Sequence, residues 1–169
     1  LVGPWRATNF NAKAFVTVND PSGAKPTEWG FVEMRNFSDM PSSEVFGVES
    51  VDRALSRFGQ SKIQSGKFNM LVENRVANKI VGMLIYPMTG GALQQKNTFL
   101  ESMKGKRIAS DKFTLVDDRL LEKGMVSNYF DNEGMAAATR PMIENGVLKN
   151  YYISNYYSKK LNMEPTTGE

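Results

Sequence analysis

The chain contains no histidine and no cysteine among its 169 residues. Without cysteine no disulfide can hold the fold together, so the chain must fold by burying apolar side chains. A chain of this length buries about 70% of the surface that its unfolded form exposes, which allows one sizeable core or two small ones. The same absence excludes a Ser-His-Asp triad, a cysteine nucleophile and a histidine-ligated metal within this chain.

Composition and charge indicate a globular domain. Apolar residues make up 41% and charged residues 23% of the chain, which is close to the globular average and argues against disorder. The net charge of +3 is small, so we do not expect direct nucleic-acid binding. The longest apolar run, residues 80–86, is far shorter than the roughly 20 residues that cross a bilayer, and no signal peptide is visible. We therefore expect a cytoplasmic protein without a membrane span.

The first part of the chain predicts two strands and a helix. Residues 12–19 alternate between apolar and polar side chains and are followed by turn chemistry at 20–23. Alternation resumes over residues 29–37, which predicts a second strand. Ser42 and Glu44 indicate a helix start, because a serine cap and an early acid satisfy free backbone N–H groups, and Gly59 marks the end of this apolar run.

The central part predicts a short strand over residues 68–72 and a helix over residues 75–86 with an apolar surface so wide that it should be largely buried. Pro87 and the Gly90-Gly91 pair should interrupt this helix, because proline lacks an N–H group and glycine weakens helix propagation.

The last part predicts short strands over residues 106–110 and 113–117, a hairpin over 141–149 and a short helix over 154–161. Asn145-Gly146 at the centre of the hairpin favours a tight turn that needs two positive φ angles. We therefore predict an α+β fold of antiparallel strands and hairpins packed with a few helices. We expect the chain to divide into residues 1–65, a strand pair plus helix, and residues 66–169, a mixed α+β unit.

Three groups of residues could carry chemistry. Asp131 and Glu133 could bind a divalent cation or act as acid and base, but acids beside glycine in turns usually accept local backbone N–H bonds. Gly90-Gly91 could cradle a phosphate, yet it follows a helix, whereas phosphate fingerprints follow a strand. Tyrosines and lysines interleaved over residues 149–160 would suit single-stranded nucleic acid, although strand and helix roles explain them as well.

Several short segments from Gly47 to the end of the chain carry a family resemblance. In order along the chain, these segments resemble the TldD/PmbA proteins from about Ala14 onward. The family proteins are longer on both sides, so the chain resembles the end of their middle region and the start of their C-terminal region. The segments are residues 47–74, GGALQ at 90–94, TFL at 98–100, FDNEG at 130–134, IENGVLK at 143–149, Tyr157-Ser158, Lys160-Leu161 and Thr167-Gly168.

The resemblance implies a relative of metalloproteases described as modulators of DNA gyrase, which process or degrade peptides. The catalytic branch of the family carries an HExxxH motif at the end of a helix, where two histidines bind zinc and the glutamate is the general base. Alignment on Gly90 and Leu93 places this motif on Tyr86, Pro87 and Gly91. Proline and glycine offer no side-chain lone pair, and a phenol is a poor zinc ligand and base at neutral pH.

The chain therefore resembles the PmbA branch, which lacks the zinc motif and pairs with a TldD-like subunit in a homo- or hetero-oligomer. We expect a non-catalytic subunit or segment of a peptidase assembly that helps to bind a peptide substrate, with no cofactor in this chain and zinc only in its partner. Gly90, Gly91, Asp131 and Glu133 are the candidate peptide-binding residues. The alternatives are a peptidase whose zinc ligands lie outside this chain, an acid-based site at Asp131 and Glu133, and a separate binding module.

Overall fold

The computed structural model describes residues 6–166, so the Thr167-Gly168 segment lies outside the described residues. The chain forms two compact units, Leu1–Phe68 and Asn69–Glu169. Helices and antiparallel sheets occur together, which confirms the α+β fold predicted from the sequence. Across residues 6–166, every helix is too short or too polar to cross a bilayer.

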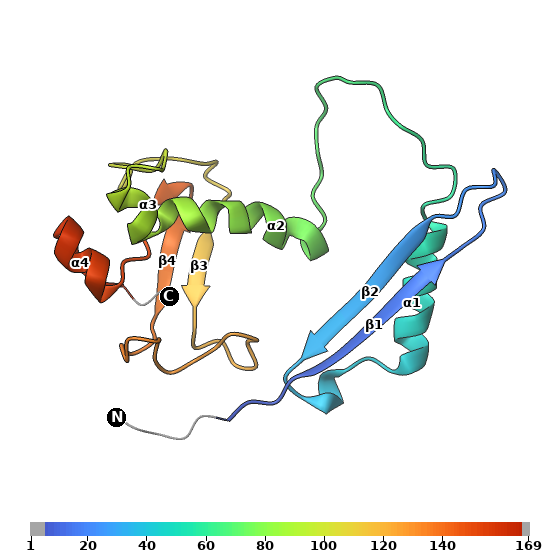
Figure 1. The fold of residues 1–169 in the computed structure, drawn as a ribbon, viewed down its shortest axis with the longest axis horizontal. Helices are drawn as coiled ribbons and strands as arrows, with labels where there is room; N and C mark the ends of the chain where they lie inside the picture. The colour runs from blue at the N-terminus through green and yellow to red at the C-terminus, as the bar shows by residue number, and fades with distance from the viewer. Residues whose placement is uncertain (1–5, 167–169) are drawn as a thin grey trace. The chain divides into compact units, whose positions relative to one another are not determined.

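The first unit is a β-hairpin with one helix on one face (Figure 1). Strands β1 (Phe10–Thr17) and β2 (Thr27–Met34) pair antiparallel over all eight residues of each. A 3₁₀ turn, η1 (Phe37–Asp39), leads to helix α1 (Ser43–Leu55), which packs on both strands. The predicted serine cap is confirmed, because the Ser42 side chain accepts a hydrogen bond from the Val45 N–H at 3.2 Å.

Small residues allow α1 to lie close to the hairpin. Gly30 is buried in β2 opposite Ala14, and Ser50 and Ala54 are the buried residues of α1. A Cβ atom on Gly30 would collide with the Ser50 hydroxyl and lie 3.2 Å from the Phe46 ring. The glycine is therefore required by the close approach of the helix to the strand.

Asp20 connects the hairpin loop to the chain that follows α1. Its carboxylate accepts hydrogen bonds from the Ser22 N–H at 2.7 Å and from the Gly59 N–H at 2.8 Å. Gly59 has a φ of +68°, a left-handed conformation that a side chain disfavours. The Ser22 hydroxyl, followed by these backbone N–H groups of Ser22 and Gly59, lowers the pKa of Asp20 below the ordinary value for aspartate.

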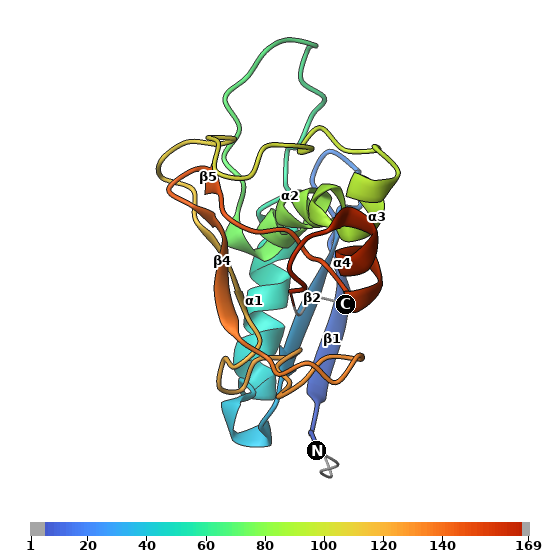
Figure 2. The same cartoon turned by 90° about the vertical axis from the view of Figure 1, so that its left-hand side faces the viewer.

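The second unit packs helices and a three-stranded sheet around the larger core (Figure 2). Its sheet has the order β3-β4-β5, and every pairing is antiparallel. The predicted hairpin is confirmed, with Asn145 at φ 47° and Gly146 at φ 79°. The elements are α2 (Asn74–Ile85), η2 (Tyr86–Met88), α3 (Gly90–Gln94), β3 (Leu115–Asp118), β4 (Thr139–Glu144), β5 (Val147–Leu148) and α4 (Asn155–Leu161).

The core of the second unit draws on segments far apart in the sequence. Its buried side chains come from the α2–α3 corner, the sheet and the segment before α4, and apolar side chains of α2 and α4 pack around them. Burial of this apolar surface is the main favourable contribution to folding in a chain without disulfides. The buried residues are Met88, Leu93, Leu100, Met142, Ile143, Leu148, Tyr151, Tyr152 and Ile153.

Two strands predicted from the sequence do not form. Residues 68–72 form no strand, and Met70 and Leu71 are among the most exposed apolar side chains. Residues 106–110 contribute only one isolated bridge, between Arg107 and Val147. A strand needs a partner, and local alternation cannot supply one.

Helix α2 was predicted to be largely buried, yet it has no buried residue. Val76, Ile80 and Met83 are exposed, while Leu84 and Ile85 at its end pack against the core. The apolar pattern defines a face that can be covered, but it does not say which part of the chain covers it. The helix also starts one residue earlier than the predicted residue 75, at Asn74, and Glu73 occupies the N-cap.

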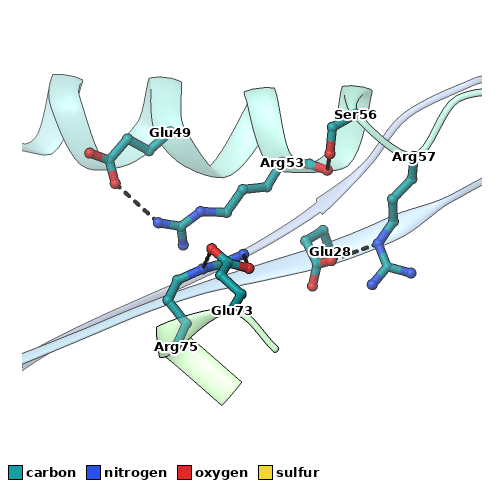
Figure 3. A network of polar contacts seen from close by, with 7 residues as sticks. All are labelled: Glu28, Glu49, Arg53, Ser56, Arg57, Glu73 and Arg75. Carbon is teal, nitrogen blue, oxygen red and sulfur yellow. Dashed lines mark hydrogen bonds and ion pairs between the residues drawn. The ribbon is translucent and has the colours of Figure 1, made fainter. Parts of the chain in front are cut away.

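Ion pairs lie on exposed surfaces of the chain (Figure 3). Arg53 pairs with Glu49 one helical turn away at 3.2 Å, and the Arg57 Nε lies 2.6 Å from a Glu28 oxygen. Such exposed pairs contribute at most about 1 kcal/mol each. They complement the packing of α1 on the hairpin without determining it.

Gly30 and Gly47 form a matched pair for testing the approach of α1 to β2. Gly30→Ala should lower the free energy of unfolding of the first unit by about 1–3 kcal/mol, because the added methyl group overpacks the contact with Ser50 and Phe46. Gly47→Ala in α1 meets open space and should raise it by about 0.5–1 kcal/mol. Urea denaturation followed by circular dichroism measures both effects, and equal effects would contradict the close approach.

The hydrogen bonds of Asp20 predict an acid-sensitive first unit. A lowered pKa in the folded state means that the carboxylate stabilises the fold above the ordinary aspartate pKa. This contribution should be lost as the pH falls through the lowered pKa of Asp20. Ser22→Ala should weaken this pH dependence and Asp20→Asn should remove it, as measured by urea midpoints between pH 7 and pH 3. An unchanged pH profile in Asp20→Asn would contradict the assignment.

Candidate functional site

The α2–α3 corner contains Tyr86, Pro87 and Gly91, the positions at which the family resemblance implies the zinc motif would fall. Tyr86 ends α2, and its side chain is 55% exposed. Its carbonyl accepts hydrogen bonds from both the N–H and the hydroxyl of Thr89, at 3.0 and 2.9 Å. The Pro87 carbonyl accepts a bond from the Thr98 hydroxyl at 2.7 Å. These contacts close the helix, and the residues do not fit a zinc ion.

Within residues 6–166, no three Asp or Glu side chains gather into a group that could hold a metal ion.

The predicted interruption of the helix is confirmed, because α2 ends at Ile85 and η2 follows, and the diglycine then starts the short helix α3. The Thr89 hydroxyl accepts a hydrogen bond from the Ala92 N–H and caps α3. The Gly90 N–H donates to the Tyr152 carbonyl at 2.7 Å, and the Tyr152 N–H donates to the Met88 carbonyl at 2.9 Å. This parallel bridge joins the corner to the segment that precedes α4.

Gly90 and Gly91 make room for one tyrosine. A Cβ atom on Gly90 would lie 2.6 Å from the Tyr157 Cβ and 2.9 Å from its Cγ. A Cβ atom on Gly91 would lie 3.2 Å from the Tyr157 hydroxyl. Gly90 is also buried, so the surface that a peptide could reach at this point is formed by its neighbours.

Asp131 and Glu133 are both engaged within the fold. The buried Asp131 accepts hydrogen bonds through one oxygen from the N–H groups of Glu133 and Met135, each at 2.9 Å. Glu133 accepts bonds from the backbone and side-chain N–H groups of Asn155, at 2.8 and 3.2 Å. The first carboxylate therefore holds a turn, and the second anchors the start of α4.

A half-buried acidic group lies on the sheet. Asp117 in β3 faces Arg140 across the pairing with β4. Burial raises the pKa of Asp117, while Arg119 and Arg140 oppose the rise. One of its carboxylate oxygens is buried without a hydrogen-bond partner within residues 6–166. Burial raises the pKa of Tyr152 to about 12, with the Asp117 charge adding to the rise, so this phenol stays protonated at neutral pH.

The hairpin of the first unit offers strand edges and an aromatic face. In the part of the chain that the structure describes, β1 and β2 pair only with each other, so each strand has an outer edge without a neighbour. Phe15 and Trp29 lie opposite each other on the side away from the buried positions, with Phe31 next along β2. These aromatic side chains are exposed, and the Lys13 Nζ lies 5.4 Å from the Phe31 ring centre.

Comparison with known proteins places the chain in a family. Residues 65–169 match the PmbA/TldA metallopeptidase C-terminal domain. The chain is 30% identical over 149 residues to the metalloprotease PmbA of Escherichia coli O157:H7, covering 88% of this chain and 33% of that protein. The chain belongs to the PmbA/TldD family.

Solved structures agree with this assignment. The fold superposes with a TM-score of 0.86 on a Bacteroides thetaiotaomicron protein proposed to be a modulator of DNA gyrase, at 34% identity, covering 94% of this chain and 36% of that one. TldE from Thermococcus kodakarensis, at 23% identity and a TM-score of 0.71 over the same shares, has the same fold. The chain spans about a third of the length of these PmbA/TldD relatives.

Substitutions at Gly90 and Gly91 test whether these glycines are needed for packing against Tyr157 in this PmbA/TldD chain. Gly90→Ala should lower the free energy of unfolding of the second unit by about 1–3 kcal/mol, because the methyl group collides with Tyr157. Gly91→Ala should cost less, since its contact is with the far end of the ring. In a Tyr157→Ala background the cost of Gly90→Ala should shrink, which denaturation of the four variants measures as a double-mutant cycle. A cost that is unchanged without Tyr157 would contradict this packing role.

Proposed function

We propose that this chain is a non-catalytic, PmbA-like part of a TldD/PmbA-type peptidase assembly, which helps to hold a peptide substrate while a TldD-like partner supplies the zinc. The assembly is a homo- or hetero-oligomer and acts in the cytoplasm. The observation that carries the proposal is the α2–α3 corner, where Tyr86, Pro87 and Gly91 occupy the aligned motif positions.

The chemistry of the corner supports this division of labour. HExxxH supplies two imidazoles and a carboxylate at the end of a helix, and each of the three has lone pairs for a metal or a proton. Here the carbonyls of Tyr86 and Pro87 are used to close the helix. The space beside Gly91 is taken by the Tyr157 ring. Because the corner offers packing contacts and no metal ligands, we expect another subunit to carry out catalysis.

The hairpin supports the peptide-holding part of the proposal. An extended peptide can add to a strand edge through backbone hydrogen bonds, and side chains of the neighbouring face then give selectivity. The outer edges of β1 and β2 are each eight residues long, and Phe15, Trp29 and Phe31 line the exposed face. A peptide with apolar side chains at alternate positions matches such a surface.

The candidate residues Gly90, Gly91, Asp131 and Glu133 contribute to this role as supports. Their contacts to Tyr157, to backbone N–H groups and to Asn155 fix the corner and the start of α4. A second candidate function is a peptidase whose zinc ligands lie outside this chain, which the name metalloprotease of its relatives favours. The acid-based alternative is less favoured, because Asp131 and Glu133 already accept hydrogen bonds within the fold.

Co-expression tests the proposal. The chain should co-purify with the HExxxH-bearing relative from the same genome, and the pair should cleave an unstructured peptide faster than the relative alone. Metal analysis should find zinc in the pair and none at stoichiometric level in this chain alone. Glu→Gln in the partner's motif should abolish cleavage without preventing co-purification.

A matched change in this chain serves as the control. Phe15→Ser with Trp29→Ser removes the aromatic pair on the exposed face and should weaken peptide cleavage by the pair, while Val116→Ser on another exposed strand position should not. Stoichiometric zinc in this chain alone would overturn the proposal in favour of the second candidate. Failure to co-purify, together with no gain in cleavage, would also contradict it.

A further inference from the structure

A pocket of about 380 Å³ opens on the surface of the second unit. Leu93 and Tyr151, both largely buried, form its apolar base, while Leu161 and Met163 line it from the end of α4 and the residues after it. The loop at residues 101–104 forms the remaining side. The volume lies at the lower end of the range of roughly 300–1,000 Å³ that small-molecule sites occupy.

A single hydroxyl group fixes the loop side of the pocket. The Tyr151 hydroxyl donates a hydrogen bond to the Leu100 carbonyl at 2.6 Å and accepts bonds from the N–H groups of Met103 and Lys104, each at 3.2 Å. The same tyrosine therefore supplies the base of the pocket and holds its loop in place. A site that is formed before the ligand arrives loses less conformational entropy on binding.

The α4 side is also fixed by hydrogen bonds. Asn162 ends the helix in a left-handed conformation with a φ of 52°. The Met163 N–H donates to the Ser158 carbonyl at 3.1 Å, and the Ser158 hydroxyl donates to the Met163 carbonyl at 2.7 Å. This closure holds Met163 beside Leu161, where both pack against the core.

The loop carries one charge of each sign. Glu101 and Lys104 both line the pocket and are exposed. Neither takes part in the ion pairs found within residues 6–166. A base without charge and an edge with opposite charges do not favour an anion or a metal ion. They favour a ligand that carries an ammonium group, a carboxylate and an apolar side chain together.

We propose that this pocket binds a short peptide with free ends, such as a dipeptide with apolar side chains. One apolar side chain lies against Leu93, Tyr151 and Met163, the ammonium group faces Glu101 and the carboxylate faces Lys104. The proposal rests on the peptide-holding role proposed above. The pocket would be a second peptide site, separate from the hairpin edges and suited to the short products that a peptidase releases.

Titration of the whole chain with L-leucyl-L-leucine tests the proposal. In nitrogen-15 NMR spectra the amide signals of Ser102, Lys104 and Leu161 should shift as the dipeptide concentration rises and reach a plateau. The N-acetylated, C-amidated form of the same dipeptide lacks both charges, and its affinity should be at least about fivefold lower. No saturable shift at these amides, or equal binding of the capped form, would overturn the proposal.

Variants locate the binding in the pocket. Met163→Trp fills the cavity and should weaken binding about tenfold, and Lys104→Glu on the exposed loop should weaken it about fivefold without disturbing the core. Lys112→Glu, an exposed lysine of the same unit outside the pocket, is the matched control and should leave binding unchanged. Equal loss in Lys104→Glu and Lys112→Glu would overturn the proposal. If the chain co-purifies with its partner but does not bind the dipeptide, the pocket proposal is overturned and the proposed function is not. If it binds the dipeptide without co-purifying, the pocket proposal is supported and the proposed function is not.

Discussion

Two backbone hydrogen bonds at Tyr152 organise the second unit. They join the Tyr152 carbonyl and N–H to Gly90 and Met88, and so fix the α2–α3 corner against the chain before α4. The neighbouring Tyr151 then lies in the core with its hydroxyl bound to the loop at residues 100–104. Tyr157, five residues after Tyr152, fills the space that the diglycine leaves. This bridge thus links the corner to the chain segment from which the pocket and α4 continue.

The corner also shows how the end of α2 is stabilised in this chain. A helix end needs its last carbonyls satisfied, whatever side chains it carries. In this chain Thr89 and Thr98 satisfy the carbonyls of Tyr86 and Pro87, so the corner is stable without a metal. The two threonine hydroxyls thus hold the backbone of the corner, whatever side chains stand at Tyr86 and Gly91.

Local patterns in the sequence predicted the local structure well. The two strands, the serine-capped α1, the Asn145-Gly146 turn and α4 each follow from neighbouring residues alone, and the structure confirms them. The strand over 68–72 and the burial of α2 were wrong, because both require contacts from elsewhere in the protein. For the site, the missing imidazoles could be read directly from the sequence. The fit of Tyr157 to Gly90, the hydroxyl contacts of Tyr151 and the buried oxygen of Asp117 depend on distant segments, and no spacing rule could find them.

The placement of the methionines decides how this chain responds to oxidants. With no thiol present, thioethers are its most readily oxidised groups. Met70 and Met83 are more than 70% exposed and would take up oxygen first, at little cost to the fold. Met88 and Met142 are fully buried in the core, where a polar sulfoxide would disrupt packing. The exposed pair can thus be consumed by an oxidant while the interior survives, and damage to the buried pair marks the point at which the second unit has opened.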